Sequence, residues 1–174
     1  MNLLFWHVFR LVETMVKEIR LYDWQVPHVD RLLQILTTSH GANDTSATGS
    51  GKTIVACSIA YQWNYPFVLV FGPKSIKRKW ETTGKEYGIN VIFMTYAKLR
   101  GKNNPYLRRV GTQIIATQAF LNLVRAGLLL VSDETSCLKN DSDQSRCFHV
   151  LVQALASMQS PSRVLLLSAT PIDK

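Results

Sequence analysis

The chain of 174 residues carries 20 Lys and Arg against 12 Asp and Glu, which gives a net charge of +8 at pH 7. Hydrophobic residues make up 47% of it and charged residues 18%, and this excludes a disordered chain, which is poor in apolar residues and rich in charge. The length fits one domain, and three cysteines without zinc-ligand spacing indicate free thiols in a reducing, intracellular compartment.

The first segment, residues 1–20, predicts a helix that packs against the domain. Its apolar part, Leu3 to Phe9, follows no cationic segment and ends at Arg10, so neither a signal peptide nor a membrane span is expected. No internal repeat or second-domain boundary is visible. We therefore expect a single domain over residues 1–174 and no membrane attachment.

The rest of the sequence alternates between helical and extended patterns. Apolar spacing predicts helices around residues 29–36 and 148–155, and residues 53–61 predict a helix that is apolar nearly all round. Short apolar runs predict strands at residues 67–71, 91–94, 113–116, 128–131 and 164–167. Because these runs are continuous, we expect a parallel sheet covered by helices, in a three-layer α/β fold. Residues 41–45 make a poor strand, and residues 101–105 predict a surface loop.

A phosphate-binding loop is predicted ahead of the helix at residues 53–61. It comprises Ser46, Ala47, Thr48, Gly49, Ser50, Gly51, Lys52 and Thr53, and it ends in the Gly-Lys-Thr of a P-loop. Gly49 and Gly51 let the backbone curl so that successive N–H groups point at phosphate oxygens. We expect Lys52 to reach the β- and γ-phosphates of ATP and the Thr53 hydroxyl to bind Mg²⁺. A Gly- and Ser-rich loop that only caps a helix is the alternative.

An acidic pair, Asp133 and Glu134, follows the apolar run that begins at Leu128. A P-loop enzyme needs a carboxylate at a strand end to hold Mg²⁺ and a base to orient the attacking water. We expect Asp133 to bind the metal, and Glu134, on the opposite side of the strand end, to polarise the water. Lys52, Asp133 and Glu134 are thus the predicted catalytic residues. The alternative is a solvated acidic turn.

Three motifs in this order resemble the first RecA-like domain of superfamily 2 helicases. Thr48 to Thr53 is similar to the P-loop of DEAD-box and related helicases, Asp133-Glu134-Thr135-Ser136 stands at the place of the DEAD/DEAH box, and Ser168-Ala169-Thr170-Pro171 resembles the Ser-Ala-Thr motif. The resemblance implies a RecA-like P-loop fold with a mainly parallel sheet flanked by helices. It also implies that Ser168 and Thr170 couple the nucleotide state to nucleic-acid binding. Helix capping is the alternative for these two residues.

Finer features resemble the Swi/Snf-type branch of DNA translocases. Leu21-Tyr22-Asp23-Trp24-Gln25 is similar to the branch's Leu-x-Pro-Tyr-Gln segment, Leu138-Lys139-Asn140 to its extension after the acidic box, and Trp80 to the tryptophan of its motif Ia. The resemblance implies that Gln25 reads the adenine, and helix capping is again the alternative. Tyr22 and Trp24 are expected to pack in the core or at an edge. The family completes its ATP site with arginines from a second RecA-like domain, which we expect to lie outside this chain.

Nucleic acid is expected to contact backbone N–H groups and basic residues that follow the strands. Pro73 and Lys74 follow a predicted strand and begin a helix, where Lys74 and Lys77 add positive charge. The position of the family's motif Ib is taken by Thr117 and Gln118, and Thr95-Tyr96 is the competing assignment.

The positive charge of the chain is concentrated in one segment. Residues 72–110 hold ten Lys and Arg and two acidic residues, which equals the net charge of the whole chain. We therefore expect an ATP-hydrolysing motor domain of a Swi/Snf-like translocase that binds nucleic acid, DNA rather than RNA, and that alone hydrolyses ATP weakly. The alternatives are a P-loop NTPase that acts on a small molecule and a truncated, non-catalytic nucleic-acid-binding module.

Overall fold

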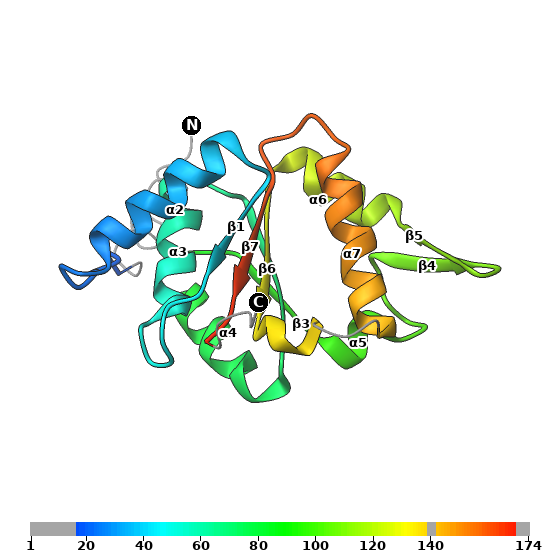
Figure 1. Ribbon diagram of the computed structural model, residues 1–174, viewed down its shortest axis with the longest axis horizontal. Helices are drawn as coiled ribbons and strands as arrows, with labels where there is room; N and C mark the ends of the chain where they lie inside the picture. The colour runs from blue at the N-terminus through cyan, green and yellow to red at the C-terminus, as the bar shows by residue number, and fades with distance from the viewer. Residues whose placement is uncertain (1–16, 139–141, 170–174) are drawn as a thin grey trace, which may run out of the picture.

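The computed structural model describes residues 17–138 and 142–169. They form three layers, a central sheet with helices on each face (Figure 1). The sheet has five strands in the order β1-β7-β6-β2-β3, and all neighbours are parallel. These strands are β1 (Gly41–Asp44), β2 (Phe67–Gly72), β3 (Val91–Thr95), β6 (Leu128–Asp133) and β7 (Arg163–Leu167). The predicted α/β fold with a mainly parallel sheet is confirmed.

Helices cover both faces of this sheet. One face packs against α2 (Val26–Thr38), α3 (Lys52–Gln62) and α4 (Lys77–Glu86), and the other against α5 (Tyr96–Arg100), α6 (Gln118–Ala126) and α7 (Asp143–Ala156). Two short 3₁₀ helices, η1 (Lys74–Ile76) and η2 (Thr135–Leu138), follow β2 and β6. Along β2, Val68 and Val70 pack in the first layer, whereas Leu69 and Phe71 pack in the second. Burial on both faces is why the strand sequences are continuously apolar.

One predicted strand lies outside the central sheet. β5 (Gln113–Ala116) pairs antiparallel with β4 (Leu107–Val110) in a separate two-stranded sheet. The strand at residues 113–116 is therefore confirmed, but its expected place in the parallel sheet is wrong, because a two-residue turn folds it back on β4. Gly111 in this turn has a φ of +60°, a conformation that glycine adopts without steric cost. The predicted loop at residues 101–105 connects α5 to β4.

A second difference concerns β1, which the sequence predicts to be a poor strand. It forms the edge of the sheet and pairs in parallel with β7, from Gly41 opposite Val164 to Asp44 opposite Leu167. Ala42 and the side chain of Asp44 are buried. Pairing with a fully formed strand thus overrides the weak local preference of this segment.

The segment ahead of α2 runs along the same layer as α4. Residues 17–20 are not helical; Lys17 N donates to the Glu86 carbonyl at 2.8 Å, and Ile19 packs against the core. The remainder of the helix predicted at residues 1–20 lies outside the described residues. Among the helices that the structure describes, none is both long and apolar enough to cross a membrane.

Candidate nucleotide-binding site

The predicted motifs follow the last residues of the five parallel strands. We call these residues the carboxyl row; they are Asp44, Gly72, Thr95, Asp133 and Leu167. Leu167 pairs with Asp44 on one side and with Asp133 on the other, and Gly72 pairs with Thr95. Gly72 also lies beside Asp133, since a Cβ added to Gly72 would be 3.5 Å from the Asp133 Cβ. The P-loop, Ser168, Glu134 and Pro73 directly follow this row. It is the edge at which open α/β sheets bind ligands.

The P-loop leads from β1 into α3 with the geometry of a phosphate cradle. Gly49 and Gly51 have φ values of +83° and +81°, and α3 begins at Lys52. A Cβ at Gly51 would lie 2.5 Å from Gln25 Nε2, so a side chain at this position would clash with Gln25. A tight glycine turn that ends in a helix N-terminus fits the phosphate groups of ATP.

Contacts within the loop hold the Lys52 ammonium group. Its Nζ donates to the carbonyl oxygens of Ser46 at 2.6 Å and Ala47 at 2.9 Å. The hydroxyl oxygens of Ser46 and Ser50 lie 2.7 Å apart across the loop. Phosphate oxygens carry more negative charge than these carbonyls and would compete with them for the ammonium group.

Asp44 anchors the start of the loop, a role that the sequence did not indicate. Its side chain is buried, and Oδ1 accepts from Ser46 N at 2.9 Å and lies 3.1 Å from His28 Nε2 of α2. The Asp44 carbonyl accepts from Ser168 N at 3.0 Å. One residue thus connects α2, the P-loop and the segment after β7. The sequence signal for this role is a carboxylate two residues ahead of Ser46, but the weak strand pattern of residues 41–45 gives no reason to expect it to be buried.

Gln25 contacts the P-loop directly. It stands at the N-cap of α2, but its side chain caps no described N–H group of that helix. Instead Nε2 donates to the Ser50 carbonyl at 2.8 Å, and Oε1 accepts from Tyr22 N at 3.0 Å. Of the two expected placements of Tyr22 and Trp24, packing in the core is wrong: they are 71% and 53% exposed and stack on each other on the turn before α2.

Asp133 is the last residue of β6, and a residue of α4 donates a hydrogen bond to its carboxylate. The Trp80 indole Nε1 donates to Asp133 Oδ2 at 2.8 Å. Burial raises the pKa of the Asp133 carboxyl, and the Trp80 hydrogen bond and the charges of Lys79 and Lys52 oppose this rise. Thr53 lies in the first turn of α3, at the same edge. Carboxylate and hydroxyl oxygens are hard ligands, so Thr53 and Asp133 fit Mg²⁺.

Glu134 follows the strand in an unusual conformation. Its φ is +62°, in the left-handed region that costs a non-glycine residue about 1–2 kcal/mol, and its carbonyl accepts from Cys137 N at 3.0 Å. Strand alternation therefore ends at Asp133, and the direction of Glu134 is set by this turn into η2. Such outliers persist where the surrounding structure enforces them, often at functional sites.

The structure describes only some residues of two predicted motifs. Ser168 is buried beside β1, whereas Thr170 and the Lys139-Asn140 part of the Swi/Snf-like segment lie outside the described residues.

Of the predicted nucleic-acid contacts, Pro73, Lys74 and Lys77 follow β2 at the carboxyl row, and Lys77 pairs with Glu81 at 3.5 Å. Thr117 and Gln118 follow β5 in the small sheet, and Thr117 caps α6 by accepting from Phe120 N. The competing Thr95-Tyr96 segment belongs to the row itself.

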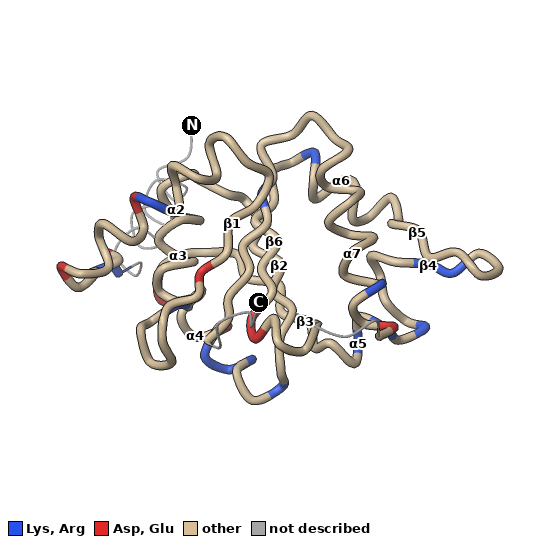
Figure 2. Tube along the Cα trace, in the orientation of Figure 1, with Lys and Arg blue, Asp and Glu red and all other residues tan. Residues whose placement is uncertain are grey.

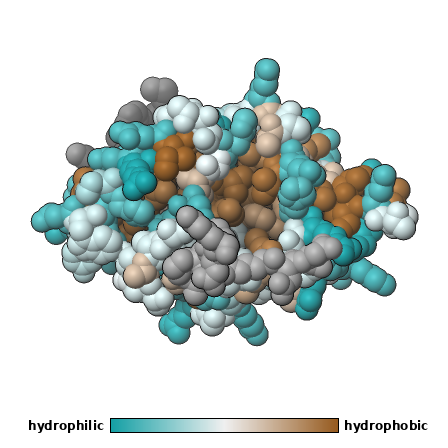
Figure 3. Space-filling view, viewed as in Figure 1, coloured by the Kyte–Doolittle hydropathy of each residue, from teal (hydrophilic) through white to brown (hydrophobic). Residues whose placement is uncertain are grey.

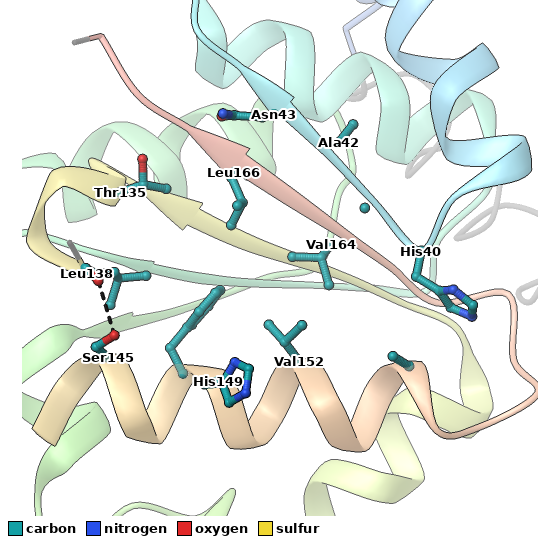
Figure 4. Close-up of a pocket in the computed structure, with 13 residues that line it drawn as sticks. His40, Ala42, Asn43, Thr135, Leu138, Ser145, His149, Val152, Val164 and Leu166 are labelled. Atoms are coloured by element: carbon teal, nitrogen blue, oxygen red, sulfur yellow. Dashed lines mark hydrogen bonds between the residues drawn. The ribbon is translucent and has the colours of Figure 1, made fainter. Parts of the chain in front are cut away.

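A separate pocket of about 670 Å³ lies between α7 and the face of β1 and β7. Val152 of α7 and Val164 and Leu166 of β7 point into it (Figure 4). Hydrophobic surface is exposed there, between α2 and α7 (Figure 3). Thr135 and Leu138, which follow the acidic pair, line this pocket, but no residue of the P-loop does.

The chain is similar to known proteins in sequence and in fold. The family described as DEAD/DEAH box helicase matches residues 32–174. Two proteins of Acanthamoeba polyphaga mimivirus are similar in sequence, "Putative ATP-dependent RNA helicase L538" at 22% identity over 148 residues and "Putative ATP-dependent RNA helicase L364" at 26% over 165 residues. The matches cover 83% and 87% of this chain but only 28% and 30% of those proteins.

The fold is similar to a solved structure, the Sulfolobus solfataricus SWI2/SNF2 ATPase core in complex with dsDNA. The TM-score is 0.56 at 18% sequence identity, and the match covers 91% of this chain and 33% of that chain. At this identity the similarity concerns the fold alone, and it agrees with a RecA-like arrangement of strands and helices.

Proposed function

Because the chain belongs to the DEAD/DEAH box helicase family, we propose that it is the ATP-binding motor domain of a Swi/Snf-like nucleic-acid translocase. The strongest support is the shared carboxyl row, from which the P-loop, the acidic pair and the basic segment after β2 all emerge. Chain segments far apart in sequence thereby meet where a nucleotide can contact each of them.

The predicted residues of the nucleotide site and of the Ser-Ala-Thr motif have the following roles in this proposal. Residues 46–53 hold the phosphates, Gln25 reads the adenine, and Thr53 and Asp133 hold Mg²⁺. The metal ion, when bound, neutralises charge that develops on the phosphate oxygens. Glu134 orients the attacking water. Ser168 and Thr170 couple the nucleotide site to nucleic acid, and the bond from Ser168 N to the Asp44 carbonyl supports a connection to the P-loop.

The chain spans less than a third of the curated relatives that it matches. We propose that a second RecA-like domain completes the ATP site with arginines. In other phosphoryl-transfer enzymes such an arginine raises the turnover rate about 10³- to 10⁵-fold. The 174-residue chain should therefore bind ATP but hydrolyse it far more slowly than about 1 per second, even with saturating nucleic acid. The rate of phosphate release from ATP, measured with saturating nucleic acid, tests this expectation.

Robust turnover stimulated by nucleic acid would contradict the need for a second domain. An effect of nucleic acid on ATP binding or turnover also separates this proposal from a P-loop NTPase that acts on a small molecule. Nucleic-acid binding without any ATP binding would favour the non-catalytic module instead.

Nucleic acid is proposed to bind the basic residues of segment 72–110. They form two groups (Figure 2), one on η1 and α4 and one on α5 and β4. A cavity of about 470 Å³ beside the second group is lined by Arg100, Lys102 and Arg108. Arg109 is partly neutralised by its ion pair with Asp143, the helix-start residue of α7. Exposed cations of this kind contact the phosphate backbone.

The double variant Lys74→Glu/Arg100→Glu is expected to weaken nucleic-acid binding by at least about tenfold and to lower the slope of log K against log salt by about 2 for duplex DNA. Both side chains belong to exposed residues, so the change should leave ATP affinity intact. Fluorescence anisotropy at several salt concentrations measures both effects.

A matched control, Arg31→Glu/Arg125→Glu, makes the same change of charge outside the segment. Equal weakening by the two double variants would mean that the segment acts only through net charge. The Swi/Snf-like features favour DNA, whereas the mimivirus relatives are named as RNA helicases. Duplex DNA and duplex RNA should therefore be titrated side by side, and tighter RNA binding would overturn the preference for DNA.

A further inference from the structure

The metal-binding carboxylate of Asp133 is held by a buried tryptophan from the neighbouring layer. Trp80 is fully buried in the layer of α2, α3 and α4, and its indole N–H donates to Asp133 Oδ2 at 2.8 Å. Hydrogen bonds to ionised groups are short and strong, and they restrict the orientation of the carboxylate. The backbone of Glu134 also donates a hydrogen bond to this carboxylate.

Tyr96 restrains the same residue from the opposite layer. Its hydroxyl donates to the Asp133 carbonyl at 2.8 Å and lies 2.8 Å from Ser132 Oγ. Tyr96 is buried in the layer of α5, α6 and α7, which restricts the position of its hydroxyl. Trp80 thus holds the side chain of Asp133, and Tyr96 holds its main chain.

The helices that carry these two aromatic residues also carry exposed cations. Lys77, Arg78 and Lys79 directly precede Trp80 on α4, and all three are exposed. Lys98 and Arg100 follow Tyr96 on α5 and are exposed as well. Each helix therefore presents charge to solvent at one side and contacts the metal-binding residue at the other.

We propose that Trp80 is a positioning residue that couples nucleic-acid contact at α4 to metal binding at Asp133. This inference rests on the proposed function. A small displacement of α4 changes the direction of the carboxylate, and Mg²⁺ is sensitive to such a change because it demands near-octahedral geometry. By linkage the coupling is reciprocal, so nucleic acid and the Mg²⁺-nucleotide complex change each other's affinity by the same factor.

The test compares Trp80→Phe with the wild-type chain. Binding of a non-hydrolysable ATP analogue is titrated with Mg²⁺, with and without a duplex DNA. The variant is expected to need about fivefold to tenfold more Mg²⁺ for half-maximal binding, because one charge-assisted hydrogen bond is lost. Binding of the analogue without Mg²⁺ should not change, and the effect of DNA on the analogue's Kd should fall toward a factor of one.

Trp63→Phe is the matched control, because Trp63 packs against the same core at the far end of α3 from Lys52. Trp80→3-benzothienylalanine removes only the N–H and keeps the ring volume, so it tests the proposal even where Trp80→Phe fails to fold. An unchanged Mg²⁺ requirement and DNA effect in this isostere would overturn the inference. So would a wild-type chain in which DNA has no effect on analogue binding. A wild-type chain that binds neither analogue nor DNA would overturn the proposed function itself.

Discussion

Replacement of Lys52 by alanine is expected to weaken ATP affinity by about 10²- to 10⁴-fold. In the structure its ammonium group is held by two loop carbonyls, at 2.6 and 2.9 Å, at the point where phosphates would bind. Hydrogen bonds to charged groups contribute about 1.5–3 kcal/mol each, and each 1.4 kcal/mol corresponds to about a factor of ten. Two such bonds to phosphate oxygens account for the expected loss. Calorimetric titration with an ATP analogue and Mg²⁺ measures it.

Lys85→Ala is the matched control, since it removes the same charge from an exposed position on α4. Its ATP affinity should equal that of the wild-type chain. Lys52→Arg should recover only part of the affinity, because a planar guanidinium does not replace a compact ammonium group in a tight loop. Unchanged affinity in Lys52→Ala would mean that the loop caps α3 without binding phosphate.

Replacement of Glu134 by glutamine is expected to lower ATP hydrolysis by about 10²- to 10⁴-fold, the usual contribution of a general base. ATP affinity should change little, because the phosphates and Mg²⁺ are assigned to residues 46–53 and Asp133. Glutamine keeps the size of the side chain and the left-handed backbone at this position. Single-turnover hydrolysis with enzyme in excess measures the effect even when the wild-type rate is low.

The control for this variant is Glu18→Gln, which neutralises an exposed carboxylate ahead of α2. It should hydrolyse ATP at the wild-type rate. Loss of ATP binding together with hydrolysis in Glu134→Gln would indicate a structural role for the turn into η2. Hydrolysis at the wild-type rate would assign the base to another residue.

The parallel sheet could be predicted because its strands are buried on both faces. Phe67 to Phe71 and Leu128 to Val131 contain no polar residue, and the structure places them side by side in the middle of the sheet. The P-loop could be predicted because its glycines and lysine are adjacent in sequence. The apolar runs and the P-loop motif are both local in sequence, so they can be identified without knowledge of the tertiary fold.

Features that depend on tertiary contacts could not be predicted. β1 is a strand because β7 lies beside it, and β5 pairs with β4 because a tight turn reverses the chain. The hydrogen bond from Trp80 to Asp133 joins residues 53 positions apart. The sequence places Trp80 in a motif, but only the tertiary contact between α4 and the end of β6 brings it to Asp133. The burial of Asp44 and its contacts with His28 and Ser168 likewise depend on the tertiary fold.

The fold separates the basic residues of segment 72–110 into two groups. The excess of basic residues lies in one stretch of sequence, but the structure divides it between η1 with α4 and α5 with β4. The helix of the first group contacts the Asp133 carboxylate through Trp80, whereas the helix of the second contacts only the Asp133 main chain, through Tyr96. Nucleic-acid contacts at the first group are therefore expected to affect nucleotide binding more strongly.

The central claim is that the carboxyl row of this sheet binds ATP with Mg²⁺. Calorimetric titration of the 174-residue chain with a non-hydrolysable ATP analogue tests it most directly. We expect one analogue to bind per chain, with an affinity that falls when Mg²⁺ is chelated and in the Asp133→Asn variant. The absence of saturable binding, or binding that is indifferent to both Mg²⁺ and Asp133, would contradict the claim.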